Sequence, residues 1–164
     1  MSLLILLAVI CRPGLYSPGR DIQTILSARI YHSLYRFEFK GCISCFACKT
    51  RDGKSYGKCA VKDDLTPVYA EINGADAIIL GSPIYFGDVT GQLRSFMERL
   101  LFPHYTYTDQ ILFPRTICTG LIYTMNAPEE WAQAVGYEWI FNNNEAYMKK
   151  IFGHAESIMS YDTY

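Results

Sequence analysis

Hydrophobic residues along the chain form unbroken runs in some places and helically spaced positions in others. The runs at 3–10 and 77–80 contain no polar residue, which is typical of parallel strands covered on both faces. The whole pattern predicts strands at 3–10, 34–39, 75–80, 116–125 and 155–161, and helices near 22–30, at 62–73, from Thr90 to Leu100, from Pro128 to Gly136 and at 138–152. Strands that alternate with helices in this way indicate an α/β protein with one doubly wound, five-stranded parallel sheet.

The stretch from Ala77 to Leu100 contains the clearest of these transitions, from a buried strand through a small-residue loop to an amphipathic helix. We expect the strand to stop at Gly81, where Gly, Ser and Pro follow one another. The helix then presents Leu93, Phe96, Met97 and Leu100 to the sheet, and its charged residues Arg94, Glu98 and Arg99 are expected to point away. The loop between strand and helix lies at the carboxyl end of a parallel strand, where open α/β sheets bind their ligands.

The sequence from Ser82 to Arg99 closely resembles the flavin-binding loop and following helix of the NADPH-dependent FMN reductase family, whose members are flavodoxin-like flavoproteins. The resemblance implies the strand order 2-1-3-4-5. It also implies that this loop runs along the ring of a bound FMN, with the backbone of Tyr85-Phe86-Gly87 facing the polar edge of the ring. The implied ring contacts are Pro83, Ile84, Tyr85, Phe86, Gly87 and Thr90 on this loop, and Tyr123, Met125 and Asn126 on the next.

In this family the first strand leads into a Ser-Pro loop, followed by a Thr, that holds the FMN phosphate at a helix start. One alignment places Ser17-Pro18 and Thr24 at these positions, with Arg20 as a nearby cation. Another places Arg12-Pro13 there and leaves no matching Thr. We adopt the first, which makes Ser17, Arg20 and Thr24 the expected phosphate ligands.

The resemblance is close over 37–161 and loose over 1–36, where the loop is longer and the helix shorter than in relatives. The last helix of the family has no counterpart after residue 161. The chain is therefore read as one flavodoxin-like domain over 1–164 with an atypical N-terminal region.

Four of the six cysteines form the pattern C-x2-C-x2-C-x10-C, made by Cys42, Cys45, Cys48 and Cys59. Clustered thiolates suit an iron–sulfur cluster or zinc, and free thiols are the third alternative. The iron-sulfur flavoproteins, a Cys-rich branch of the same family, bind a 4Fe-4S cluster with a similar motif, although the last gap is longer here. We expect the residues from Lys49 to Tyr56 to loop out so that Cys59 returns to the others.

Charge and composition exclude several other classes of function. The net charge is -1 and 19% of the residues are charged, which gives no basic surface for nucleic acid or an anionic membrane. The apolar start at 3–10 has no positive residue before it and is too short to span a bilayer. The expected location is the cytoplasm.

The connection at 102–110 is long and aromatic, and long loops in compact domains tend to be functional. In the family, such insertions often lie at a subunit interface, so we expect a homodimer or tetramer. His104 in this connection could donate a proton to a substrate, but a single loop histidine is more often solvated. Asp63 and Asp64 are read as helix-capping residues without a chemical role.

The resemblance implies an FMN-dependent oxidoreductase that receives hydride from NADPH or NADH and reduces a quinone, nitro compound, free flavin or similar small acceptor. Because the flavin carries the redox chemistry, no catalytic side chain is required. One alternative is an electron-transfer iron–sulfur flavoprotein that exchanges electrons with a ferredoxin-like partner. Another is a family member that has lost cofactor binding.

Overall fold

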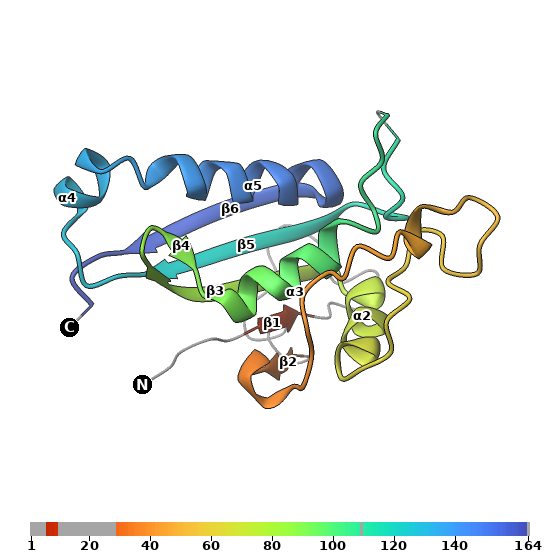
Figure 1. The fold of residues 1–164 in the computed structure, drawn as a ribbon. Coiled ribbons are helices and arrows are strands. Elements are labelled where there is room, and N and C mark those ends of the chain that lie inside the picture. The colour runs from red at the N-terminus through yellow and green to blue at the C-terminus, as the bar shows by residue number, and fades with distance from the viewer. Residues whose placement is uncertain (1–5, 10–28, 109, 164) are drawn as a thin grey trace, which may run out of the picture.

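The computed structural model describes residues 6–9, 29–108 and 110–163, which form one twisted sheet with helices packed on it (Figure 1). The strands are β1 (Leu6–Val9), β2 (Arg29–His32), β3 (Ala77–Tyr85), β4 (Asp88–Val89), β5 (Ile117–Thr124) and β6 (Gly153–Ser160). The helices are α2 (Leu65–Gly74), α3 (Gly91–Leu101), α4 (Glu129–Ala134) and α5 (Glu138–Phe152), with the short 3-10 turns η1 (Leu34–Arg36) and η2 (Ala47–Lys49).

The sheet has the order β2-β1-β3-β5-β6, and β4 pairs with β3 outside this path. Strands β3, β5 and β6 are parallel, with Ile79 opposite Gly120 and Gly120 opposite Glu156. Strand β1, however, runs antiparallel to both β2 and β3. The prediction of an all-parallel, five-stranded sheet is therefore wrong in this part, because a short apolar strand can pair in either direction and its sequence does not encode which.

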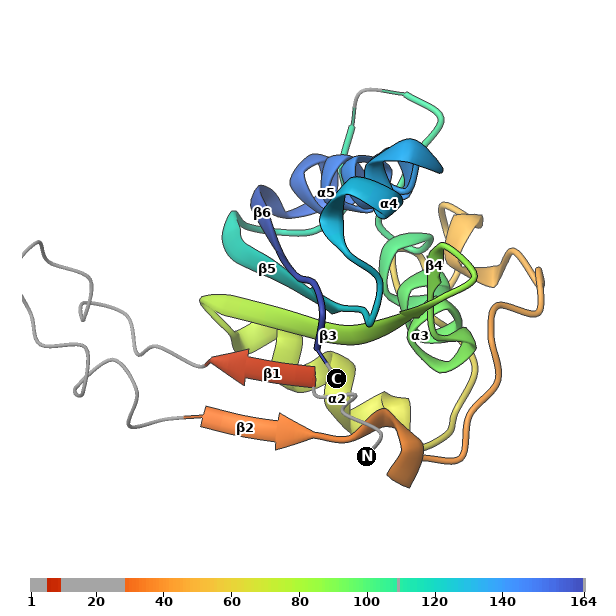
Figure 2. The same ribbon diagram turned by 90° about the vertical axis from the view of Figure 1, so that its left-hand side faces the viewer.

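One face of the sheet carries the hydrophobic core. Alternate residues of β3, such as Ile78 and Leu80, are fully buried with Phe96 of α3 and Met148 of α5. Figure 2 shows α3 and α5 on the same side of β3 and β5. On the other face Ile158 is 67% exposed, so the helices of the described residues form a layer on one side only. The helix predicted near 22–30 lies outside the described residues, except for residues 29 and 30, which belong to β2.

The segment 34–39 is not the predicted strand. Its first residues form η1, where the Arg36 amide donates to the Ser33 carbonyl at 3.0 Å and the Leu34 side chain is fully buried. Phe37 and Phe39 then pack against the core. Apolar residues at these positions are compatible with a strand or with a tight turn followed by an extended segment, and the second arrangement is the one observed.

Strand β3 is longer than predicted, because it does not stop at Gly81. Its residues Ser82 and Pro83 continue the parallel pairing with β5, opposite Tyr123 and Thr124. The later elements match the predictions closely, and α5 covers 138–152 as its spacing indicated. Within 6–9, 29–108 and 110–163, no helix is long and apolar enough to cross a membrane.

Candidate functional site

The hairpin formed by β3 and β4 ends in a turn whose two residues both have a left-handed backbone. Tyr85 pairs with Asp88, and between them Phe86 and Gly87 have φ angles of 53° and 81°. Positive φ at both positions is typical of tight two-residue hairpins. Glycine adopts this conformation freely, but phenylalanine does so at a cost, and the Phe86 side chain is fully exposed. A strained backbone that holds an aromatic side chain in solvent marks this turn as a candidate binding element.

Hydrogen bonds between small polar side chains fix the base of the turn to the start of α3. The Thr90 amide donates to Ser82 Oγ at 3.0 Å, and Ser82 Oγ donates to the Pro83 carbonyl at 2.7 Å. Thr90 Oγ1 accepts from the Leu93 amide at 3.3 Å and caps the helix. Both hydroxyls are buried, so the predicted ligand Thr90 has a structural role in holding the turn.

The second predicted loop lies directly beside the turn, because Pro83 of β3 is opposite Thr124 of β5. This neighbourhood was predicted from the parallel sheet and is confirmed. Asn126 is exposed at this edge. The side chains of Tyr123 and Met125 instead lie in the core, with exposed fractions of 1% and 5%.

Tyr123 is held in the core by a ring and an amide. Its ring stacks on Phe141 with 4.8 Å between centroids, and Asn144 Nδ2 lies 3.4 Å from its hydroxyl. Burial raises the pKa of Tyr123 to about 12, although the Asn144 hydrogen bond acts in the opposite direction. Tyr123 is therefore a neutral core residue, and its side chain is not part of the exposed edge.

Two aromatic residues that the sequence analysis did not assign to the site support the turn. A Cβ atom at Gly87 would lie 2.7 Å from a ring carbon of Tyr137, so glycine is required there for contact as well as for φ. The Tyr137 ring packs edge-on against Trp131, with 5.4 Å between centroids. The density of aromatic residues just after the carboxyl end of β5 is the sequence signal that could have identified them.

An ion pair joins the hairpin to the helical layer. Arg94 Nη2 of α3 lies 2.6 Å from Asp88 Oδ1 of β4, and Arg94 Nη1 donates to Asn144 Oδ1 of α5 at 3.1 Å. Both partners of the ion pair are partly exposed. The guanidinium therefore connects three elements close to the turn.

The expected phosphate ligands Ser17, Arg20 and Thr24 lie outside the described residues. The direction of β1 shows at which edge of the sheet this strand ends. Leu6 is opposite Leu80 and Val9 is opposite Ala77, so β1 ends at the amino end of β3. The hairpin turn lies at the carboxyl end, and the chain therefore leaves β1 at the edge opposite to the turn.

All four clustered cysteines, Cys42, Cys45, Cys48 and Cys59, line one small cavity beside the carboxyl-terminal half of α3. The Gly57 amide donates to the Cys48 carbonyl at 3.0 Å. This bond closes the loop 49–56 on itself and returns the chain to the cavity, as the sequence indicated. The cysteines are all free thiols in this structure.

The thiols differ in their surroundings. Cys42 and Cys45 are exposed, whereas Cys48 is buried, and burial raises its pKa against the opposing effect of Lys49. In the part of the chain that the structure describes, no three His, Cys, Asp or Glu side chains are grouped closely enough to hold a single metal ion. Between the first three cysteines, Ser44 and Phe46 have positive φ angles of 52° and 55°.

Arg99 does not point away from the protein as its helical position predicted. Arg99 is buried, with 2% of its surface exposed. Its guanidinium forms an ion pair with Asp63 through two hydrogen bonds, and its Nε atom donates to the Cys59 sulfur at 3.4 Å. Nη1 also donates to the Lys40 carbonyl at 3.1 Å. Burial alone disfavours the charged form, but the bonds to Asp63 and Cys59 outweigh it and raise the pKa of Arg99. Asp63 thus has a pairing role beyond helix capping.

His104 is not the solvated residue that the sequence suggested. Its ring packs edge-on against Phe113 with 5.1 Å between centroids, and its Nδ1 atom is buried. Burial, with a smaller effect of Lys49, lowers its pKa to about 4. The imidazole is therefore neutral at neutral pH.

Known proteins resemble this chain in sequence and in fold. An iron-sulfur flavoprotein of Methanocaldococcus jannaschii is 43% identical over 67 residues, which cover 41% of this chain and 32% of the relative. An iron-sulfur flavoprotein of Archaeoglobus fulgidus is 40% identical over 72 residues, covering 44% and 32%. The matched segment therefore spans about a third of the length of these curated relatives.

Among solved structures, the NAD(P)H:quinone oxidoreductase from Methanothermobacter marburgensis is similar, with a TM-score of 0.50 and 13% identity. The alignment covers 66% of this chain and 56% of that one, and it supports a flavodoxin-like α/β fold. The model of the NADPH-dependent FMN reductase family matches residues 31–118, which include the hairpin turn and all four clustered cysteines. Since this match covers more than half of the chain, the protein belongs to the NADPH-dependent FMN reductase family.

Proposed function

We propose that this protein is an FMN-dependent oxidoreductase that takes electrons from NADPH or NADH and passes them to a small acceptor such as a quinone, a nitro compound or free flavin. The observation that carries the proposal is the strained turn at Phe86 and Gly87, which lies at the carboxyl edge of the sheet, just beyond the pairing of Pro83 with Thr124. Family membership and the names of the similar proteins support the same chemistry.

The chain's residues have distinct roles in this proposal. The backbone from Ile84 to Gly87 would lie against the flavin ring, and the exposed rings of Tyr85 and Phe86 would flank it. Tyr137 supports the turn from behind Gly87, and the buried bond between Ser82 and Thr90 fixes its base. When bound, FMN supplies the transfer of hydride and electrons between nicotinamide and acceptor.

Titration of the purified protein with FMN, followed by its visible absorption, tests this proposal. We expect FMN to bind and its absorption to bleach when NADPH or NADH is added without oxygen. Adding a quinone should then restore the absorption. A protein that binds no flavin at tens of micromolar would overturn the proposal and support the reading in which cofactor binding has been lost.

We propose a 4Fe-4S cluster on Cys42, Cys45, Cys48 and Cys59 as a second candidate, which would make the protein an electron-transfer iron–sulfur flavoprotein. Four thiols around one cavity form the donor set that such clusters use. Arg99 Nε, which lies 3.4 Å from the Cys59 sulfur, would donate a hydrogen bond to this ligand.

Anaerobic reconstitution with iron and sulfide distinguishes the two candidates. A bound cluster adds broad brown absorption and stoichiometric iron to the flavin bands. Cys45→Ala should abolish both signals. Cys118→Ala is the matched control, because Cys118 is exposed on β5 and does not line the cavity. Iron incorporation that is equal in both variants would contradict the cluster assignment.

We also propose that the protein forms a homodimer or tetramer and has no nucleic-acid or membrane partner. Aromatic side chains support an interface, since Tyr107 is 77% exposed and Trp139 is 71% exposed. Sedimentation at micromolar concentration tests the assembly, and a monomer alone would contradict it.

A further inference from the structure

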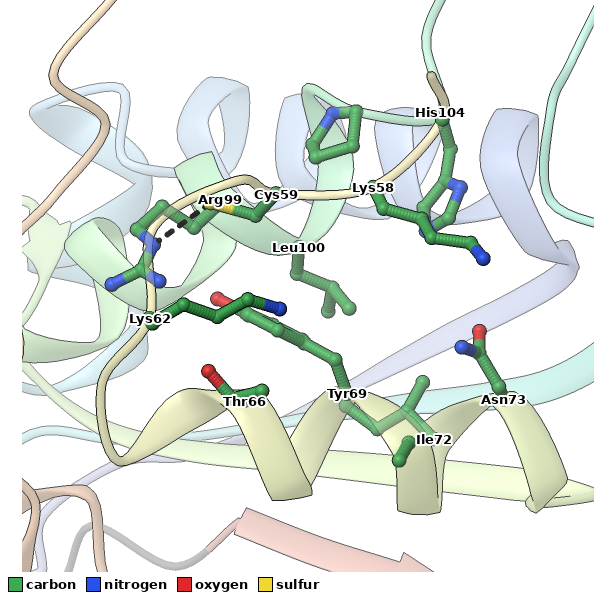
Figure 3. A pocket seen from close by; sticks show the side chains of 13 residues that line it. Lys58, Cys59, Lys62, Thr66, Tyr69, Ile72, Asn73, Arg99, Leu100 and His104 are labelled. Atoms are coloured by element: carbon green, nitrogen blue, oxygen red, sulfur yellow. Dashed lines mark hydrogen bonds between the residues drawn. The ribbon is translucent and has the colours of Figure 1, made fainter. Parts of the chain in front are cut away.

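A cavity away from the hairpin turn lies between α2, the carboxyl-terminal half of α3 and the segment that contains Lys58 and Lys62 (Figure 3). Its volume is about 220 Å³. It shares Cys59, Arg99 and Pro103 with the cysteine cavity, but its other lining residues are different.

The charges that line this cavity are all positive. They belong to Lys58, Lys62 and Arg99, and no carboxylate is among the lining residues. Asp63 neutralises Arg99 through two hydrogen bonds. Neither lysine forms an ion pair with any residue that the structure describes. The cavity therefore has two uncompensated positive charges, which favour an anion with two negative charges.

Two residues that line this cavity each have a buried polar atom without a hydrogen-bond partner among the described residues. They are the Tyr69 hydroxyl and His104 Nδ1. A buried polar group without a partner costs free energy, and such exceptions in folded proteins call for a specific explanation. A ligand in the cavity would supply the missing partners once these side chains turn toward it.

The Tyr69 hydroxyl is held in place by the packing of its ring. The ring stacks on Phe96 with 6.1 Å between centroids, and the guanidinium carbon of Arg99 lies 5.8 Å from its centroid. Burial raises the pKa of Tyr69, so the hydroxyl keeps its proton and acts as a donor. Figure 3 shows the Lys62 side chain and the Tyr69 ring extending into the same space, with Lys58 and His104 at the other end.

We propose that this cavity is a phosphate-binding site in which the exposed, flexible side chains of Lys58 and Lys62 close on a phosphate group from the two ends of the cavity, and the Tyr69 hydroxyl donates to one of its oxygens. Phosphate matches the site because it is close to a dianion at neutral pH and accepts several hydrogen bonds at once. Ile72 and Leu100 add an apolar wall that can accommodate a small organic group attached to the phosphate. Free phosphate and a phosphate monoester share this chemistry.

Calorimetric titration of the full chain with inorganic phosphate at low salt tests the site. We expect saturable binding that Lys58→Gln and Lys62→Gln each weaken about tenfold, which corresponds to about 1.4 kcal/mol. Lys54→Gln is the matched control and should bind as the parent does, because Lys54 is an exposed lysine that does not line the cavity. A parallel titration with phenyl phosphate identifies the source: tighter binding than inorganic phosphate indicates a monoester, and equal or weaker binding indicates free phosphate.

Tyr69→Phe separates a binding role from a structural one. The hydroxyl has no partner in the absence of a ligand, so its removal should leave the midpoint of thermal unfolding unchanged or raised. The same variant should bind phosphate several-fold more weakly. The proposal is overturned if the parent does not bind phosphate, or if all three variants bind it as tightly as the parent.

Discussion

The Nε atom of Arg99 lies 3.4 Å from the sulfur of Cys59, while the two terminal nitrogens of the same guanidinium hold the carboxylate of Asp63. One buried cation on α3 thus holds the segment 59–63, which leads into α2, against the helix. The Arg99 side chain is 1% exposed and that of Asp63 is 16% exposed. If one partner is removed, water can therefore form few hydrogen bonds to the other.

Arg99→Met should lower the free energy of unfolding by about 3–5 kcal/mol, since it leaves the Asp63 carboxylate buried without its partner. Arg94→Met is the control: the Arg94–Asp88 pair has side-chain exposures of 36% and 44%, so its loss should cost about 1 kcal/mol or less, and the lost bond to Asn144 should add about 1 kcal/mol. Urea denaturation of both variants measures the difference. Equal losses would show that burial of the Arg99 pair has no special role.

Phe86→Gly should relieve the strain of a positive φ and leave the protein as stable or up to about 1–2 kcal/mol more stable. Its affinity for FMN should nevertheless fall, because the flanking ring is lost. Phe46→Gly is a matched control, since Phe46 has a φ angle of 55° and is exposed, but lies in the cysteine segment. Thermal unfolding and FMN titration of the two variants test this prediction, and equal effects on FMN binding would contradict the placement of the ring.

Stability should depend on pH through His104. The folded protein holds its pKa at about 4, whereas the unfolded chain has a pKa of about 6.5. Between these values the unfolded state binds more protons, so the contribution is present above pH 6.5 and is lost as the pH falls towards 4. The expected loss is about 3 kcal/mol.

His104→Gln should remove that part of the pH dependence, and His154→Gln, which replaces an exposed histidine, should not. Unfolding by urea at a series of pH values in phosphate-free buffer gives both curves. If the His104→Gln curve has the same slope as the parent curve, the imidazole is not buried neutral in solution.

Riboflavin should bind within about tenfold of FMN. Each charge-assisted hydrogen bond to the phosphate contributes roughly 1.5–3 kcal/mol, and about 1.4 kcal/mol is one factor of ten. The expected phosphate ligands Ser17, Arg20 and Thr24 are on a loop that is longer in sequence than in relatives, which disfavours a full set of phosphate contacts. Titration with both ligands checks this. A preference for FMN of a hundredfold that Thr24→Ala abolishes would contradict it.

Local patterns predicted the elements near the candidate site well. The start of α3 after Thr90 and the bounds of α5 follow from helical spacing and capping residues, which act over a few neighbouring positions. The neighbourhood of Pro83 and Thr124 follows from the general geometry of parallel strands. The loop and helix motif was specific enough to indicate the family.

Features that depend on distant parts of the chain could not be predicted in this way. Arg99 is at a surface position of its helix by spacing, and it is buried because distant segments that contain Lys40, Cys59 and Asp63 cover it. The direction of β1 depends on which strands it meets, and the burial of Tyr123 depends on Phe141 of α5. In each case the partner is many residues away, and periodicity contains no information about it.

The hydrogen bond from Gly57 to Cys48 closes the segment 49–56 as a side loop whose ends meet at the cysteine cavity. The cost of closing a flexible loop rises by only about 0.6 kcal/mol for each doubling of its length. Lys49 is held by the carbonyls of Phe102 and Tyr105, but the exposed tip at Arg51 and Asp52 can gain or lose residues, or accept an inserted tag, while the cysteines on either side keep their positions. A search for such cysteine sites that requires a fixed number of residues before the last cysteine would overlook chains of this kind.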